Sequence, residues 1–478
     1  KACPWLIPAI IVRDPFEHRL LTFATSAVRP SPRPFLIFVV LTVLGAGLAY
    51  LAFNMEQETM NSALSGREET ASGWHQLRPW ALALVPLLPA LGSFFYLLGD
   101  TLDRYLSRAF IRCFGGTLLT LIAIWLLADL NDNLSDFKRS EDGWSVAGVY
   151  YLSQLPSMLV LIMPYSLLIS LLYLLGGFSK SNEIVSILQC GRSLPRLAAP
   201  LVVGGVLASL ACLVFNFHWA PQADRYRDGI LNQARIGEDG RPGMPNVIYQ
   251  NETDARIWRV DFLSSTYAEG TPLEGLTIEE YSKPGVLTRV TTAETAKWNP
   301  KNGQWTLYSG QLMDYTSETP KLSALPATYQ TDEFLETPWQ FLNPTLQPEQ
   351  RGIPSLSERL ATADLSESET QRLQTQRYLR IANALTCLIV VAIAIPLGVV
   401  FTRRGTATGV ATAVFIAAAM LFSGQVIPSF GEAGYLPPFL AAFGTNLSFG
   451  ILAYLLINRR IKGHPIYAQL RSLIGLRT

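Results

Sequence analysis

The chain of 478 residues has few charges and few of the residue patterns that carry catalytic chemistry. Charged residues make up 16% of it, against about 25% in typical soluble proteins. The five cysteines form no CxxC pair and the four histidines lie far apart, so no zinc-site spacing is present. The patterns GxxxxGK[ST], GxSxG and HExxH are also missing, which excludes a Walker A nucleotide site and two common hydrolase classes. The net charge of +1 offers no field that would attract nucleic acid.

What the sequence does contain is a series of long uncharged runs, and the mean hydropathy is +0.24. Such runs cannot face water, and about 20 apolar residues suffice for a helix to cross a bilayer. The predicted spans are 35–53, 80–99, 113–128, 146–178, 197–217, 381–401, 409–427 and 436–457. The sequence therefore predicts an α-helical integral membrane protein with eight transmembrane helices.

Basic residues in the short loops predict the orientation of these spans. With alternate crossings, five basic groups fall on one side, which we expect to be the cytoplasm. They are Arg13, Arg19, Arg29 and Arg33; Arg104, Arg108 and Arg112; Lys180, Arg192 and Arg196; Arg403 and Arg404; and Arg459, Arg460 and Lys462.

The long stretch between the fifth and sixth spans then lies on the opposite side. Within it, residues 256–262 alternate between apolar and polar positions, as in a half-buried strand. Asn302-Gly303 lies between Trp298 and Trp305, which is a strong hairpin signal. We expect residues 219–354 to form an all-β, jelly-roll-like domain, and residues 355–380, with Ser355 or Ser357 as N-cap, to form a helical connector.

Residues 179–192, between the fourth and fifth spans, predict a short amphipathic helix on the cytoplasmic side. Ser179 or Ser181 can cap its start, Glu183 suits its positive end, and Gly191 suits a left-handed residue that ends it. The apolar stripe is Ile184, Ile187 and Leu188. Two interpretations remain open: a surface loop resting on lipid headgroups, or a coupling helix that inserts into a groove of a cytoplasmic partner.

The outer end of the third span is acidic. Asp129, Asp132 and Asp136 are three and four residues apart, which places them on one helical face. They form either a solvated helix end or the polar rim of a substrate path. In the second case we expect cations among Lys138, Arg377 and Arg380 to pair with them.

Several segments together resemble the lipopolysaccharide-export permease family, the LptF/LptG membrane subunits. The similarity runs from about residue 101 to the C-terminus. It is carried by LDRYLSRAF, ADLNDNLSDF, MPYSLLISLLYLLGGFSKSNEIVSILQCGRSL, Trp219-Ala220-Pro221-Gln222, the hairpin at 298–307, Pro396-Leu397-Gly398, and GEAGYLPP before the last span.

This resemblance implies a six-span core made of residues 101–218 and 381–478, with residues 1–100 as an extension that adds two spans. It implies a non-catalytic subunit in the bacterial inner membrane with a periplasmic domain. Its implied partners are a second, homologous permease subunit, an LptB-like cytoplasmic ATPase dimer, LptC/LptA-like periplasmic jelly-roll proteins, and lipopolysaccharide as substrate. No cofactor is implied.

The resemblance also implies roles for individual residues. The ATPase contact would comprise Glu183, Ile184, Ile187, Leu188, Gly191 and Arg192, and Asp132 would lie in the span lining the substrate cavity. LDRY and the acidic span end are closer to the G-type than to the F-type subunit.

Two alternatives come from other functional classes. A secondary transporter or channel for another lipid or amphiphile needs ionisable groups or broken helices near the membrane centre, and Pro156, Pro164 and Pro396 have no charged neighbour. A lipid-modifying enzyme needs a convergent cluster, and the three aspartates have no histidine near them in sequence.

Overall fold

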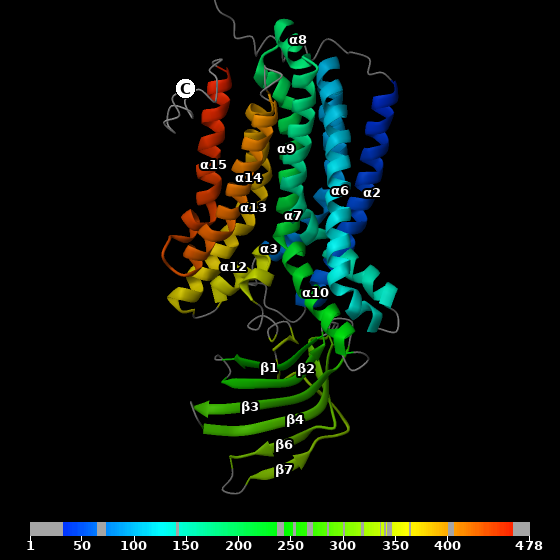
Figure 1. The fold of residues 1–478 in the computed structure, drawn as a ribbon. Coiled ribbons are helices and arrows are strands. Elements are labelled where there is room, and N and C mark those ends of the chain that lie inside the picture. Colours follow the sequence, from blue (N-terminus) through cyan, green and yellow to red (C-terminus); the bar gives the residue numbers. More distant parts are fainter. Residues whose placement is uncertain are drawn as a thin grey trace, which may run out of the picture.

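The computed structural model describes residues 32–64, 73–139, 143–236, 243–251, 255–264, 271–283, 286–299, 302–316, 320–334, 336–338, 341, 347–362, 365–399 and 406–461. It consists of a bundle of long helices with a β-domain at one end and the short helix α8 at the other (Figure 1). Arg403, Arg404 and the basic residues predicted before the first span lie outside the ranges whose side chains are described, as does Lys462.

Eight helices within the described ranges are long and apolar enough to cross a membrane, which confirms the predicted number. The helices are α2 (Pro32–Leu64), α3 (Gly73–Gln76), α4 (Arg78–Leu84), η1 (Val85–Leu87), α5 (Leu88–Leu98), α6 (Thr101–Arg139), α7 (Gly143–Lys180), α8 (Glu183–Gln189), α9 (Leu194–Phe217), α10 (Trp219–Ile236), η4 (Pro348–Gln350), α12 (Ile353–Thr362), α13 (Glu367–Gly398), α14 (Thr406–Glu432) and α15 (Pro438–Ile461). Pro79, Pro86 and Pro89 fall at the starts of α4, η1 and α5, because proline suits a first helical turn and interrupts the preceding one.

Three helices form the centre of the bundle. The most apolar windows of α7, α13 and α9 are 67%, 61% and 44% buried, whereas those of α2 and α6 are only 6% buried. Close approach depends on small residues, as is common between membrane helices. A Cβ added at Gly204 would lie 2.3 Å from Cε1 of Phe110 on α6, and one at Gly205 would lie 2.7 Å from Cγ2 of Val391 on α13. This pair of glycines lets α9 fit between α6 and α13.

The two N-terminal spans are attached to the core by buried polar contacts. The Arg78 guanidinium is paired with the Glu56 carboxylate, which also accepts a hydrogen bond from the Trp219 indole on α10 at 3.3 Å. His75 Nε2 lies 3.3 Å from Glu358 Oε2 on α12, and both side chains are 1% exposed. The extension therefore packs as part of the same body as the six-span core.

The β-domain is one antiparallel sheet. Its strands are β1 (Gly243–Asn251), β2 (Arg256–Ser264), β3 (Leu273–Lys283), β4 (Val286–Asn299), β5 (Gln304–Tyr308), β6 (Gln311–Asp314), β7 (Lys321–Ala324) and β8 (Thr328–Thr331). The long strand β4 pairs with β3 on one side and with both β5 and β6 on the other, so the sheet branches there. β1 lies nearest the helices and β7 farthest from them (Figure 1).

The predicted strand and hairpin are confirmed. In β2, Trp258 and Val260 are buried while Arg259 and Asp261 are exposed. Trp298 pairs directly with Trp305 across the hairpin, with ring centroids 5.2 Å apart. Trp258, Phe334 and Phe341 complete an aromatic core with them, and the Trp305 indole donates to the Glu336 carbonyl at 2.7 Å.

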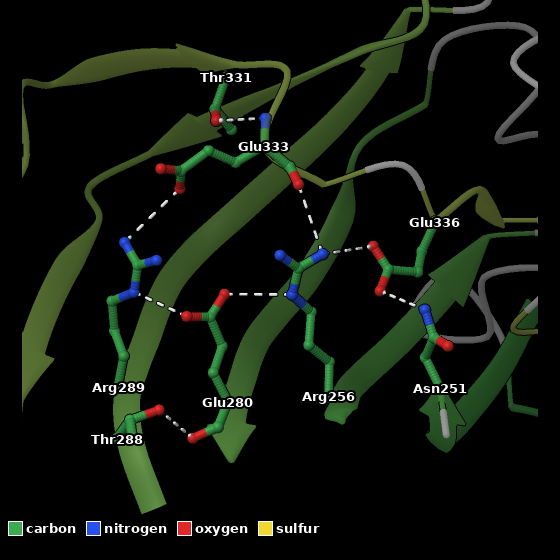
Figure 2. Close-up of polar contacts among 8 residues, drawn as sticks. All are labelled: Asn251, Arg256, Glu280, Thr288, Arg289, Thr331, Glu333 and Glu336. Atoms are coloured by element: carbon green, nitrogen blue, oxygen red, sulfur yellow. Dashed lines mark hydrogen bonds and ion pairs between the residues drawn. The ribbon is translucent and has the colours of Figure 1, made fainter. Parts of the chain in front are cut away.

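An ion-pair network fastens the segment that follows β8 to the sheet (Figure 2). Glu280 of β3 accepts hydrogen bonds from Arg256 of β2 at 3.2 Å and from Arg289 of β4 at 2.7 Å. Arg289 also pairs with Glu333 at 3.6 Å, and Arg256 pairs with Glu336 at 3.5 Å. The chain is thereby held on the sheet as it leaves β8.

Two boundaries differ from the prediction. Residues 219–236, assigned to the β-domain from sequence, form helix α10, and the first strand begins at Gly243. In α10, Ala220, Ala223 and Leu231 are buried at helical spacing against the core, so the 3.6-residue period prevails here. Ser355 and Ser357 lie inside α12 rather than capping it. The observed cap is Ser366, whose Oγ accepts the Glu369 N–H at 3.3 Å and starts α13, which runs through the span to Gly398.

Candidate functional site

Helix α8 is seated on the helical core by its apolar stripe. Ile184 is completely buried in the main hydrophobic cluster, and Ile187 and Leu188 pack against that cluster. The stripe that the resemblance assigns to the ATPase contact therefore faces the chain's own core. The outward face consists of the exposed residues Ser186, Gln189 and Cys190.

Glu183 is held at the start of α8 by two hydroxyl groups. Tyr105 of α6 donates to Oε2 at 2.9 Å, and Ser181 donates to Oε1 at 2.8 Å. The Tyr105 ring is in turn stacked on Phe178 of α7, with centroids 5.8 Å apart. The predicted serine caps are not observed: Asn182 is the N-cap, in a left-handed conformation with φ 60°, and makes no side-chain cap. The carboxylate is thus fixed in position while remaining partly open to solvent.

The end of α8 follows the prediction. Gly191 has φ +80°, and its N–H donates to the Leu188 carbonyl at 3.0 Å. The next residue, Arg192, pairs with Asp100 at 2.9 Å, and Arg196 pairs with the same oxygen at 2.8 Å. The hydrogen bond from Arg192 lowers the pKa of the Asp100 carboxyl below its usual 3.8, with Arg196 contributing. The α8–α9 loop is therefore tied to the turn between α5 and α6.

A groove of about 540 Å³ lies between α6 and α7 toward the α8 end. Arg112, Thr117 and Thr120 line it from α6, and Ile169 and Tyr173 line it from α7. Large apolar side chains continue along the open face of α6, including Leu119 and Leu127, which are 69% and 68% exposed. In a membrane, this face is available to lipid or to another subunit.

The acidic end of α6 is only partly open. Asp129 accepts a hydrogen bond from the Tyr150 hydroxyl of α7 at 3.4 Å, Asp136 is buried, and Asp132 is exposed. Of the three predicted rim carboxylates, Asp132 is therefore the one that faces outward. Lys138, near the C-terminal end of the same helix, is also exposed.

Two arginines were predicted to pair with these aspartates. In the structure both contact other groups. Arg377 stacks over the Tyr378 ring, with its guanidinium carbon 5.3 Å from the centroid. Arg380 donates to the carbonyl of Glu349 in η4. Both come from α13: the Arg380 contact joins that helix to η4, the Arg377 contact lies within the helix, and neither is with the acidic rim.

Asp100 and Tyr105 were missed by sequence reasoning. Both act through contacts with residues about 80 to 95 positions away, and only the meeting of α6 with the α8 loop brings them together. The LDRY motif contains Tyr105 and was the available signal for it.

These features define a class of protein: a multi-pass membrane permease subunit, with a β-domain inserted between two groups of three spans and a short helix docked at the other end. No group of three or more His, Cys, Asp or Glu side chains in the described ranges is placed to hold a metal ion.

The chain belongs to the family described as lipopolysaccharide export system permease LptF/LptG, whose model matches residues 104–459. It is 22% identical, over 371 residues, to the lipopolysaccharide export system permease protein LptG of Escherichia coli K12, covering 75% of this chain and 98% of that protein. The same figures hold for LptG of Escherichia coli O6:H1. The match begins at α6, so the two N-terminal spans lie outside it. Membership confirms the predicted resemblance, makes the chain a multi-pass inner-membrane protein, and does not favour a secondary transporter or channel.

Proposed function

We propose that this chain is one of two permease subunits that extract lipopolysaccharide from the inner membrane and pass it to a periplasmic bridge, with ATP hydrolysed by a cytoplasmic partner bound at α8. The observation that carries the proposal is α8 itself. It is a short helix that packs on the core through the buried Ile184. The Glu183 carboxylate is held by two hydrogen bonds beside the exposed outward face. A rigidly seated helix of this kind can transmit a push from a partner to α7 and α9, the two helices it joins.

The energetics require such a partner. Moving acyl chains out of a bilayer opposes about 0.8 kcal/mol per CH₂ group. Lipopolysaccharide carries several chains, so the total cost far exceeds thermal energy. The sequence has no Walker A pattern, and we infer that the energy comes from a separate ATPase dimer.

The orientation follows from basic residues at the α8 end. Arg104 lies in the first turn of α6, Arg192 and Arg196 lie just after α8, and Arg459 and Arg460 lie in the last turn of α15. The start of α6, helix α8 and the end of α15 lie at the same end of the bundle (Figure 1). Since positive loops stay in the cytoplasm, the β-domain would be periplasmic. The exposed edge strands of its sheet suit pairing with a periplasmic jelly-roll protein by strand addition.

The open face of α6 supports a role as a wall of the substrate cavity, closed on its other side by the second permease subunit. We propose Asp132 and Lys138 as residues of the polar rim. Arg377 and Arg380 are included only because they lie on α13. The similarity to LptG proteins supports the G-type role.

Co-purification of the tagged full chain with the ATPase from membranes tests the proposal. Gln189→Arg places a charged side chain on the exposed face of α8 and should abolish co-purification. The matched control is Gln330→Arg, the same change at an exposed glutamine of β8 at the other end of the molecule. Retention of the ATPase by both variants would contradict coupling through α8.

A further inference from the structure

A second, larger cavity lies where the N-terminal spans meet the permease core. Its volume is about 1110 Å³, and α2, α5, α6 and α9 all contribute to its walls. Its apolar lining includes Ile37, Leu41, Phe110, Ile111, Val203 and Leu207. It is at least as large as the pockets that proteins use for small ligands, about 300–1,000 Å³. Ile37 and Ile111 in this lining are 55% and 61% exposed, so the cavity is open at its side and can be filled from a membrane.

One end of the cavity is polar. Tyr96, Ser107 and Arg108 line it there, near the turn that joins α5 to α6. The Arg108 Nε donates to the Tyr96 hydroxyl at 2.6 Å, and its guanidinium carbon lies 5.7 Å from the Tyr96 ring centroid. Among the described residues, no carboxylate lies within ion-pair distance of Arg108, and its side chain is exposed. Asp103, also at this end, accepts the Asp100 backbone N–H at 3.1 Å.

We propose that this cavity binds one anionic phospholipid, with an acyl chain between α2, α5 and α9 and the headgroup phosphate at Arg108. An apolar cavity that opens toward a bilayer is filled by the chains of that bilayer. A guanidinium at its mouth matches a phosphate group in charge and in hydrogen-bond geometry.

The position of the lipid cavity could affect how α8 is coupled to the rest of the bundle. Gly99 and Asp103 line the cavity on either side of Asp100, which pairs with Arg192 of the α8–α9 loop and with Arg196 in the first turn of α9. A bound lipid would therefore brace the turn against which the α8–α9 loop is fastened. This consequence rests on the proposed function; the binding itself does not.

Native mass spectrometry of the full chain in detergent, titrated with phosphatidylglycerol, tests the binding. We expect one retained lipid, in preference to the zwitterionic phosphatidylcholine. Ala199→Trp, which fills the cavity from α9, should remove that lipid. Arg108→Gln should weaken binding about tenfold, as expected for one charge-assisted contact. Arg112→Gln is the matched control, because Arg112 lies one turn further along α6 and lines the other groove; it should bind as the wild type does.

Equal affinity of wild type, Ala199→Trp and Arg108→Gln would overturn the proposal, as would equal losses in Arg108→Gln and Arg112→Gln. Displacement of phosphatidylglycerol by an equimolar amount of lipopolysaccharide would also overturn it, because the cavity would then be a substrate site. Circular dichroism checks that Ala199→Trp folds, and Arg108→Gln, at an exposed position, tests the site independently. Since no ATPase is present, lipid binding can succeed while coupling at α8 fails, and the reverse.

Discussion

Glu183 is a carboxylate that the chain holds in place with two hydroxyl groups. Its two described contacts come from the hydroxyl groups of Tyr105 and Ser181, and neither of these carries a positive charge. The described contacts of the carboxylate therefore include no basic side chain, and it lies beside the open face of α8. A partner that offers a basic side chain there would gain a charge-assisted hydrogen bond.

We predict that Glu183→Gln weakens binding of the ATPase about tenfold, the value of one hydrogen bond to a charged group. Tyr105→Phe keeps the carboxylate and removes one of its supports, so a smaller loss is expected. Both dissociation constants can be measured with the purified chain and ATPase in nanodiscs. A larger loss in Tyr105→Phe than in Glu183→Gln would show that the tyrosine, and not the carboxylate, makes the contact.

Gly191 is needed for its backbone conformation and not because a side chain would lack room. No heavy atom lies within 4 Å of a Cβ built at this residue, yet its φ is +80°. We predict that Gly191→Ala costs about 1–2 kcal/mol through left-handed strain alone. Hydrogen exchange should then become faster in α8 while α7 and α9 stay protected. Gly115→Ala, on α6 with equally open surroundings, is the control and should be neutral; matching behaviour of the two variants would refute the strain argument.

Asp100 makes the fastening of the α8–α9 loop depend on pH. Its folded-state pKa is lowered, first by the hydrogen bond from Arg192, so its stabilising contribution is present above pH 3.8 and is lost as pH falls through the folded pKa. We predict that wild type has a higher melting temperature than Asp100→Asn at pH 7, and that the difference shrinks below pH 3.8. Because the pair is partly exposed, 0.5 M salt should also reduce the difference. A gap unchanged by both pH and salt would rule out an ionic role.

At the scale of elements, small residues decide how closely the central helices pack. A methyl group at Gly205 would meet Val391 at 2.7 Å, so α9 and α13 would have to separate or repack. We predict that Gly205→Ala destabilises the chain by about 1–3 kcal/mol. Thermal unfolding in detergent measures this, with Gly450→Ala on α15 as control, because a Cβ there meets nothing within 4 Å. An equal effect of the two substitutions would show that helix propensity, not contact, determines the result.

Hydropathy and turn residues were sufficient to predict the main elements. The eight spans, the strand at 256–262 and the hairpin at Asn302-Gly303 each follow from a local period or a local turn, so neighbouring residues carry the whole signal. Helix α10 could not be assigned in the same way. Its polar face resembles a loop, and its helical conformation depends on burying Ala220, Ala223 and Leu231 against distant helices.

The short helix α8 lies within the predicted residues 179–192, but the direction that its apolar stripe faces was not predicted. Gly191 was correctly identified as left-handed, because the conformation of a helix end is a local property. The burial of Ile184 is not local, since it depends on the cluster that α6, α7, α9 and α13 form around it. The same periodicity describes a stripe that faces a partner and one that faces the core.

At the scale of the whole molecule, the question is whether the two extra spans are an independent attachment or part of one folded body. The family match begins at α6, yet α3 contacts α12 and α4 contacts α9 across that boundary. The buried pair of His75 and Glu358 joins the extension to the helix that leads from the β-domain back to the membrane. If the extension is integral, breaking this pair must destabilise the core as well.

We predict that His75→Ala lowers the stability of the full chain by about 2 kcal/mol, because a buried carboxylate loses a hydrogen-bonding neighbour. Glu358→Gln should cost a similar amount, and the double variant should cost less than the two single effects added, since the pair is then removed as a unit. Melting followed by circular dichroism provides all three values. Labelling of Cys387, which is buried on α13 against Cys212 of α9, reports whether the core opens in the same transition. The extension would unfold by itself if the two effects were additive, or if the temperature at which Cys387 becomes labelled did not change. Non-additive effects that reach Cys387 would mean that all eight spans fold as one body, so that a lipid bound between the extension and the core could influence α8.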